Sequence, residues 1–211
     1  MQISIIGAGR VGSALARNWQ RSGHQIQFAV RDVRAEKHQA LVSSAKLVPL
    51  GEAAGGTDVL VLATPFNAAE NAIQALGDIS GKILLDTTNP FVMGPSGLAL
   101  AFGHSDSAGE RIAAIASKAS VFKVLNTTGD NNMVDPSRYS QKPLMLIAGD
   151  ADAKKPIVSQ LVSDLGFEPG DAGPMTNARL LEAHAMLWVD LAMKRGYGRN
   201  VAFGLLRANR E

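Results

Sequence analysis

The sequence predicts an α/β fold of the doubly wound class, with helices on both faces of a mostly parallel sheet and a small helical extension at the carboxyl end. Near the amino terminus, "ISIIGAG" reads as a short buried strand that runs into a glycine turn. Strand and helix patterns then alternate along the chain, as βαβ units require. Further on, "DVLVLATP" is a continuous apolar strand, which is typical of a sheet covered on both faces. We expect the sheet domain over residues 1–175 and the extension over residues 176–211.

The first half of the chain continues this alternation. After the glycine turn, Val11, Leu15 and Trp19 recur at helical spacing, and Gly23 is the expected carboxyl-terminal cap. "HQIQFAV" is the second strand, and a polar helix of weak periodicity and the segment "AKLVPL" follow it. "FNAAENAIQAL" then predicts a helix, and "KILLDTTNP" predicts a buried strand that ends in polar residues.

The second half is expected to extend the sheet. Residues 91–109 contain several Gly, Ser and Pro without a clear period, which predicts an irregular loop near the site. "SVFKVLN" and "KPLMLIAGD" predict strands joined by a long polar connection, and a helix and the short strand and turn "FEPGDAGPM" follow. Residues 178–194 form the strongest amphipathic pattern, whose shared face consists of Leu180, His184, Leu187, Trp188 and Leu191.

Composition bounds the function. The chain has 211 residues, 46% of them hydrophobic, which is enough to bury a core. Charged residues make up 19% and aromatic residues 5%, and the basic residues form no stripe, which argues against nucleic-acid binding. There is no cysteine, so disulfides and thiolate metal sites are excluded. Neither a signal-peptide pattern nor a run of about 18 apolar residues is present. We expect a cytoplasmic protein that does not bind a membrane.

The motif "GAGRVG" predicts a dinucleotide site because it follows a strand and opens a helix. Gly7 permits the tight turn, Gly9 lets the backbone approach a pyrophosphate, and Gly12 lets helix and strand pack closely. The helix amino terminus then presents free N–H groups and a partial positive charge to the phosphate. Arg10 and Val11 lie inside this loop, where Arg10 either touches a phosphate or is solvated. The pattern is that of a Rossmann-type fold.

The second strand ends in a positive charge where NAD sites usually carry an acid. Val30 and Arg31 occupy that place, and Arg34 follows nearby. The ribose 2′-phosphate of NADP would be repelled by a carboxylate but bound by a guanidinium in a charge-assisted contact. This favours NADP(H). Two other interpretations stay open: Asp32 is the ribose acid and the strand ends later, or Arg31 is simply solvated.

Polar residues follow three further strands, where ligands of open α/β sheets bind. One group is expected near the adenosine or the linking riboses, a second is expected near the nicotinamide ribose, and a third follows the next strand. Singly, each group could be ordinary turn chemistry. In this order the groups are Thr64, Pro65 and Phe66, then Thr88 and Asn89, then Asn126 and Thr127.

No general acid or base stands out among the four histidines. His104, in the predicted loop, could reach the site, whereas His184 is expected to be an interface residue. Paired carboxylates and metal-ligand spacings are also absent from the sequence. We therefore assign no catalytic residue and no metal. A dehydrogenase that acts on an alcohol usually needs a base for the hydroxyl proton, and none is evident. The pattern favours hydride transfer to a second redox cofactor, which depends mainly on positioning.

The motifs "GAGRVG", "VRD", "ATPF", "DTTNP", "KVLNTTG" and "DAGPMTNARLLEAHAMLW" resemble the NADPH-dependent deazaflavin (coenzyme F420) reductases and their bacterial relatives. The layout is similar to the oxidoreductase domain of the STEAP ferric reductases. The resemblance covers nearly the whole chain. It implies a Rossmann domain, often dimeric, that binds NADP(H) and exchanges hydride with a deazaflavin. By position, Arg31 would take the 2′-phosphate, and the nicotinamide and second cofactor would be bordered by Asn126, Thr127, Asp171, Ala172, Gly173 and Pro174.

The sequence also departs from the reductases. Val30 replaces a common serine, the glycine turn is of the general dinucleotide type, and "NTTGDNNM" is closer to the bacterial relatives. A flavin or another small electron acceptor therefore remains open. Two alternatives remain. One is a reductase of a small carbonyl or imine substrate, although this sequence lacks the Lys–Asn pair expected of such an enzyme. The other is a non-catalytic NADPH sensor. We expect a homodimer through the last helix, although the apolar face of that helix could equally pack on its own sheet.

Overall fold

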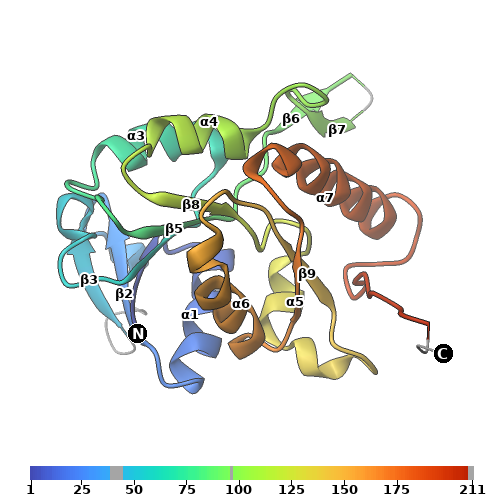
Figure 1. Ribbon diagram of the computed structural model, residues 1–211, viewed down its shortest axis with the longest axis horizontal. Helices are drawn as coiled ribbons and strands as arrows, with labels where there is room; N and C mark the ends of the chain where they lie inside the picture. The colour runs from blue at the N-terminus through green and yellow to red at the C-terminus, as the bar shows by residue number, and fades with distance from the viewer. Residues whose placement is uncertain (39–44, 96, 209–211) are drawn as a thin grey trace.

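The computed structural model, which describes residues 1–38, 45–95 and 97–208, confirms the α/β doubly wound class (Figure 1). Six parallel strands form the main sheet in the order β3-β2-β1-β4-β5-β8. The order reverses between β1 and β4, and in such sheets the crevice at this switch point is the usual ligand site. The strands are β1 (Gln2–Ile6), β2 (Gln25–Val30), β3 (Lys46–Pro49), β4 (Val59–Leu62), β5 (Ile83–Asp86) and β8 (Ser120–Lys123).

Helices cover both faces of this sheet. In Figure 1, α3 (Ala69–Gln74) and α4 (Ala108–Ile115) lie above it, and α1 (Arg10–Arg21) and α6 (Lys155–Asp164) lie below. Successive side chains of β4 alternate between two buried apolar clusters, with Val59 and Val61 in one and Leu60 and Leu62 in the other. This is why the strand sequence is apolar throughout, as predicted.

The second half extends the sheet only indirectly. β9 (Leu144–Ile147) and β10 (Glu168–Asp171) form a separate parallel pair. An antiparallel bridge between Lys123 and Ala148 joins this pair to the end of β8. Because β9 runs opposite to β8, the chain that follows β9 and β10 heads toward the amino edge of the main sheet.

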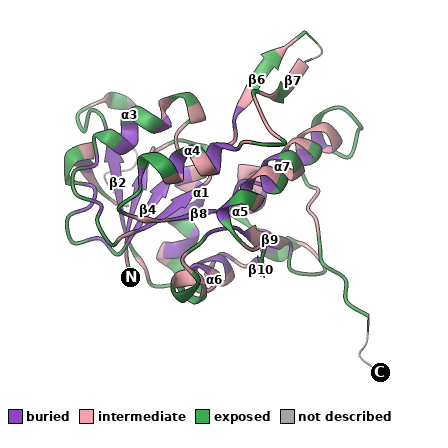
Figure 2. Cartoon of the chain, turned by 45° about the horizontal axis from the view of Figure 1, so that its top comes forward, coloured by how far each residue is buried: buried purple, intermediate pink, exposed green. Residues whose placement is uncertain are grey.

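Two expected irregular segments contain regular structure. The predicted loop after β5 holds an antiparallel hairpin, β6 (Phe91–Gly94) and β7 (Gly97–Leu100), so the loop prediction is wrong there. Its Gly and Pro residues make the turn, and the hairpin projects from the body of the molecule (Figure 2). The long polar connection contains the short helix α5 (Asp130–Val134). The side-chain amide of Asn18 in α1 donates to the Val134 carbonyl at 3.1 Å and so links α5 to α1. Of the polar helix expected after β2, the described residues show a 3-10 turn at Glu36–His38; residues 39–44 lie outside the described residues.

The last helix, α7 (Ala178–Met193), confirms the predicted element but not its predicted face. Trp188 is buried, whereas Leu180 and Leu187 are 65% and 50% exposed. The helix turns a different set of residues inward because it packs on α4 and β7. The chain that follows is tied back, since the Trp188 indole N–H donates to the Val201 carbonyl at 2.7 Å. Among the described residues, no helix is both long and apolar enough to span a membrane.

Candidate functional site

The glycine loop between β1 and α1 has the geometry of a phosphate cradle. Gly7 has a φ of +107°, and a Cβ there would lie 2.7 Å from the Ala63 carbonyl oxygen. A Cβ on Gly12 would lie 2.2 Å from the Gly7 carbonyl oxygen, so helix and loop are in backbone contact. Gly9 precedes α1, no side chain caps this helix, and its first turn holds no acidic residue. The amino terminus of α1 therefore keeps its partial positive charge available for an anion.

A cavity of about 640 Å³ opens beside this loop, at the point where the strand order reverses. Its walls come from the ends of β1, β2 and β4 and from the start of α3. It brings together five of the predicted site residues, which are Gly7, Gly9, Arg31, Thr64 and Pro65. It also includes Asp32 and His38. The sequence pattern did not single out His38 as a site residue.

The end of β2 is where the first sequence interpretation put it. The strand stops at Val30, so Arg31 is the first residue beyond it and lies exposed on the cavity wall. Arg31 forms no ion pair with any residue that the structure describes. Asp32 also lines the cavity, but its Oδ1 accepts the Arg34 backbone N–H at 2.8 Å, which closes a turn. Arg34 is exposed and does not line the cavity.

Arg10 has a partner that neither sequence interpretation anticipated. Its guanidinium binds Asp130 with two hydrogen bonds of 3.0 Å, and Arg199 reaches the same carboxylate at 2.5 Å. Burial would raise the pKa of Asp130, but the two guanidinium groups outweigh it and hold the pKa below its ordinary value. Arg10 thus joins the phosphate loop to α5 and to the chain after α7. Val11 is the next residue of α1 and is partly buried beside the core.

The turns after β5 and β8 are fastened to each other. The Asn126 side-chain amide donates to Asn89 Oδ1 at 3.0 Å, and the Asn89 amide donates to the Asn126 carbonyl at 2.9 Å. Leu125, just before, is fully buried yet has a φ of +62°. A non-glycine residue in this region is uncommon and costs of order 1 kcal/mol. Thr127 faces the interior, where its hydroxyl donates to Met145 Sδ at 3.6 Å.

Three buried polar atoms on this rim have no hydrogen-bond partner among the residues that the structure describes. They are Thr64 Oγ1 after β4, Thr88 Oγ1 after β5 and Asn126 Oδ1 after β8. Most buried polar side-chain atoms in proteins are paired, and these three follow adjacent strands of one sheet. The grouping indicates a rim that is completed by a ligand.

Phe66 packs with another aromatic residue beside this rim. Its ring meets Phe102 edge-on with centroids 5.6 Å apart, and the Arg111 guanidinium lies 3.7 Å from the Phe102 ring centroid. Phe66 is partly buried against the core and is not part of the cavity wall.

The turn containing Ala172, Gly173 and Pro174 does not join the other predicted residues. Gly173 and Pro174 line a second cavity of about 630 Å³ together with Asp150 and Lys155. The reason is the strand direction, because the chain after β10 heads away from the carboxyl edge on which the glycine loop lies. The place of this turn in the fold therefore does not support the expectation that it borders the nicotinamide.

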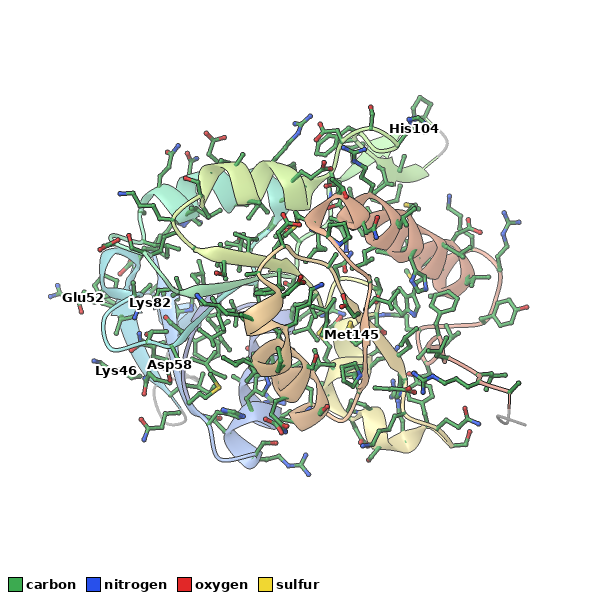
Figure 3. All side chains as sticks on the ribbon, viewed as in Figure 1. Lys46, Glu52, Asp58, Lys82, His104 and Met145 are labelled. Atoms are coloured by element: carbon green, nitrogen blue, oxygen red, sulfur yellow. The ribbon has the colours of Figure 1, made fainter. Side chains whose placement is uncertain are left out.

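The histidines are spread over the molecule. His104 is exposed on the periphery near the β6–β7 hairpin (Figure 3). His24 pairs with Asp164 at 2.8 Å, and His184 packs on Phe203, where burial lowers the pKa of its imidazole. Only His38 lies in the glycine-loop cavity, and it is 8% exposed. No group of three or more His, Cys, Asp and Glu residues that could hold a metal occurs in the described part of the chain.

Known proteins resemble this chain in both sequence and fold. The sequence model of the family described as "NADP oxidoreductase coenzyme F420-dependent" matches residues 2–90. A crystal structure of a candidate F420-dependent NADP reductase from Arthrobacter sp. FB24 is 30% identical and superimposes with a TM-score of 0.89. That alignment covers 98% of this chain and 100% of the other.

More distant relatives share parts of this similarity. Metalloreductase STEAP3 of Rattus norvegicus is 26% identical over 183 residues, which are 86% of this chain but 36% of that protein. The chain thus spans about a third of that relative's length. An imine reductase from Aspergillus terreus is 20% identical with a TM-score of 0.67, and the alignment covers 90% of this chain and 60% of that one. At that identity the likeness concerns the fold alone.

Proposed function

This chain belongs to the family of coenzyme F420-dependent NADP oxidoreductases, and from that premise we propose that it transfers hydride between NADPH and a deazaflavin or flavin-like acceptor. The observation that carries the proposal is the cavity in which the glycine loop and Arg31 come together. That combination suits a dinucleotide with an additional phosphate on its adenosine ribose. The chain belongs to a family of NADP-dependent oxidoreductases, and the identity of its hydride acceptor is what we propose.

The residues present fit NADP(H). In our proposal Gly9 and the uncapped start of α1 would hold the pyrophosphate. Arg31 binds the 2′-phosphate, and Thr64 and Pro65 border the adenosine side. The nicotinamide half reaches the turns of Thr88, Asn89 and Asn126, where two of the unpartnered polar atoms lie. When bound, the cofactor supplies the hydride, and the chain itself binds and orients it.

The chemistry of the rim supports an acceptor that needs no proton from the protein. Two titratable side chains contact the Thr88 backbone, Asp86 and Lys123, and they are fully buried and 2.7 Å apart. A general acid must be able to reach the substrate, and this pair cannot. Hydride transfer to a flavin-like ring makes no such demand on the chain, whereas reduction of a carbonyl does.

We expect the purified protein to oxidise NADPH when the deazaflavin coenzyme or a free flavin is supplied, at about 1 s⁻¹ or faster. Nicotinamide absorbance measures the reaction, and NADH in place of NADPH is the control. NADPH binding without turnover on either acceptor would contradict the proposed reaction and leave a sensor. Turnover only with small carbonyl or imine compounds would replace it with the reductase alternative.

We also propose that two copies of the chain associate through the outer face of α7. Leu180 and Leu187 lie seven residues apart on this helix, and they are 65% and 50% exposed to solvent. Apolar side chains at this spacing suit helix–helix contact between two copies.

Replacing Leu180 and Leu187 together with glutamine is expected to convert a dimer into a monomer, because the contact loses its apolar side chains. Light scattering on a sizing column measures the mass. Leu206→Gln is the matched control, since Leu206 is 80% exposed but lies outside the helix. A wild-type protein that is monomeric at about 10 μM, well above typical dimer dissociation constants, would exclude this contact.

A further inference from the structure

A buried charged network lies directly beneath the rim and contacts the Thr88 backbone. Lys123, the last residue of β8, is fully buried. Its Nζ lies 2.7 Å from Asp86 Oδ2 and 3.1 Å from Glu182 Oε1. The three side chains come from β8, β5 and α7, which are distant in sequence. The network therefore joins the main sheet to the last helix.

Glu182 extends the network to a fourth element. Its Oε2 accepts the Ala108 backbone N–H, and its Oε1 accepts the Gly109 backbone N–H, both at 3.0 Å. These N–H groups begin α4 and would otherwise be unpaired. One carboxylate of α7 thus caps α4 and contacts the Lys123 ammonium at the same time.

The network converges on the backbone of Thr88. Lys123 Nζ donates to the Thr88 carbonyl at 2.7 Å. On the other side, Asp86 Oδ1 accepts the Thr88 backbone N–H at 2.8 Å. The polar backbone groups of Thr88 are therefore held by two members of the network. The Thr88 hydroxyl is buried and unpartnered, and Asn89 beside it is paired with Asn126.

Stability alone does not explain such a network. Desolvation of buried charges offsets most of their attraction, and well-packed apolar residues in their place are often equally stable or better. What apolar residues cannot do is hold a carbonyl and an N–H of one residue in a defined orientation. The geometry points to Lys123 as a positioning residue that, braced by Asp86 and Glu182, sets the Thr88–Asn89 turn to receive the nicotinamide half of the cofactor. This inference rests on the proposed function.

The inference predicts that damage to the network affects one half of the cofactor only. Glutamine in place of Glu182 keeps the size of the side chain but offers a single acceptor oxygen, so at least one of its N–H or ammonium donors loses its partner. We expect Glu182→Gln to weaken NADPH binding about tenfold or more, since small displacements of positioning groups have effects of this size. Binding of adenosine 2′,5′-bisphosphate, which lacks the nicotinamide half, should stay within about twofold of wild type. Isothermal titration gives both affinities, and nicotinamide fluorescence reports the environment of the ring.

Glu110→Gln is the matched control. Glu110 also links α4 to α7, through hydrogen bonds of 2.8 and 2.6 Å from Arg179, but it does not touch Lys123 or Thr88. We expect this variant to bind both ligands like the wild type. If Glu182→Gln proves too unstable to assay, Lys123→Met combined with Asp86→Asn and Glu182→Gln removes all three buried charges together and should show the same selective loss.

These measurements distinguish failure of the positioning role from failure of the proposed function. Equal loss of both ligands in the Glu182 variant, no loss of either, or an identical loss in Glu110→Gln would overturn the positioning role. A wild-type protein that binds neither NADPH nor the bisphosphate would instead overturn the proposed function.

Discussion

Replacing Arg31 with glutamate is expected to weaken NADPH binding by about 2–3 kcal/mol, which is roughly 30- to 150-fold in the dissociation constant. Arg31 is the first residue after β2, lies on the wall of the glycine-loop cavity and is exposed. The substitution removes a charge-assisted hydrogen bond to the 2′-phosphate and puts a repelling carboxylate in its place. NADH has a hydroxyl at that position, so its affinity should change by less than about twofold.

Titration calorimetry with both cofactors measures this difference. Arg17→Glu is the control for charge reversal, because Arg17 is exposed on α1 but does not line the cavity. An equal loss for NADPH and NADH would refute the phosphate role of Arg31. Asp32→Asn addresses the alternative, since a large loss of NADH binding in that variant would identify Asp32 as the ribose acid.

Local patterns predicted the parts of the fold that depend on neighbouring residues. The glycine motif needs a strand before it and a helix after it, and both are determined by short apolar periods around Gly7 and Gly12. The strand containing Val59 to Leu62 reads as buried on both faces because every residue in it is apolar. The place where β2 ends was predictable for the same reason, since the apolar run stops at Val30.

What could not be predicted depends on contacts between distant residues. Arg10 and Asp130 are 120 positions apart, so no local pattern distinguishes their ion pair from a free arginine in the phosphate loop. His38 lies in a segment of weak periodicity, and only the folded chain brings it to the cavity. The position of Gly173 depends on the direction of β9 relative to β8, which the strand sequences do not encode.

The buried network was missed for a further reason. Lys123 and Glu182 occupy positions where a sequence pattern expects an apolar or a solvated side chain, and charged residues are rarely fully buried. One signal was available, because Lys123 interrupts the apolar run "VFKVL" in the middle of a predicted strand. A charge at such a position requires a buried partner.

Alanine is expected to lower stability at one glycine of this loop and cofactor affinity at another. At Gly12 the new Cβ would lie 2.2 Å from the Gly7 carbonyl oxygen and 3.1 Å from Ile5 Cγ2. Backbone atoms cannot yield as a flexible side chain can, so Gly12→Ala should lower the free energy of unfolding by about 3 kcal/mol. Urea denaturation measures it.

Gly9 has room for a side chain in the protein alone. A Cβ there meets nothing within 4 Å, and the backbone is extended with a φ of −82°, which alanine adopts without strain. Gly9→Ala should therefore leave the free energy of unfolding within about 1 kcal/mol of wild type. The absence of a Cβ at Gly9 is required only if the pyrophosphate lies against this backbone. In that case Gly9→Ala should weaken NADPH binding by about 2 kcal/mol through steric conflict.

Gly204→Ala is the matched control for this pair, because that position is also open and Gly204 lies in the chain after α7. Wild-type NADPH affinity in Gly9→Ala would exclude a phosphate at the start of α1, even with Arg31 confirmed. If Gly9→Ala loses NADPH affinity while its free energy of unfolding is unchanged, packing within the chain cannot explain the loss, because a Cβ at Gly9 touches no described residue. That result would place the pyrophosphate over Gly9 and would connect the glycine motif, the uncapped helix and Arg31 as contacts of one bound molecule.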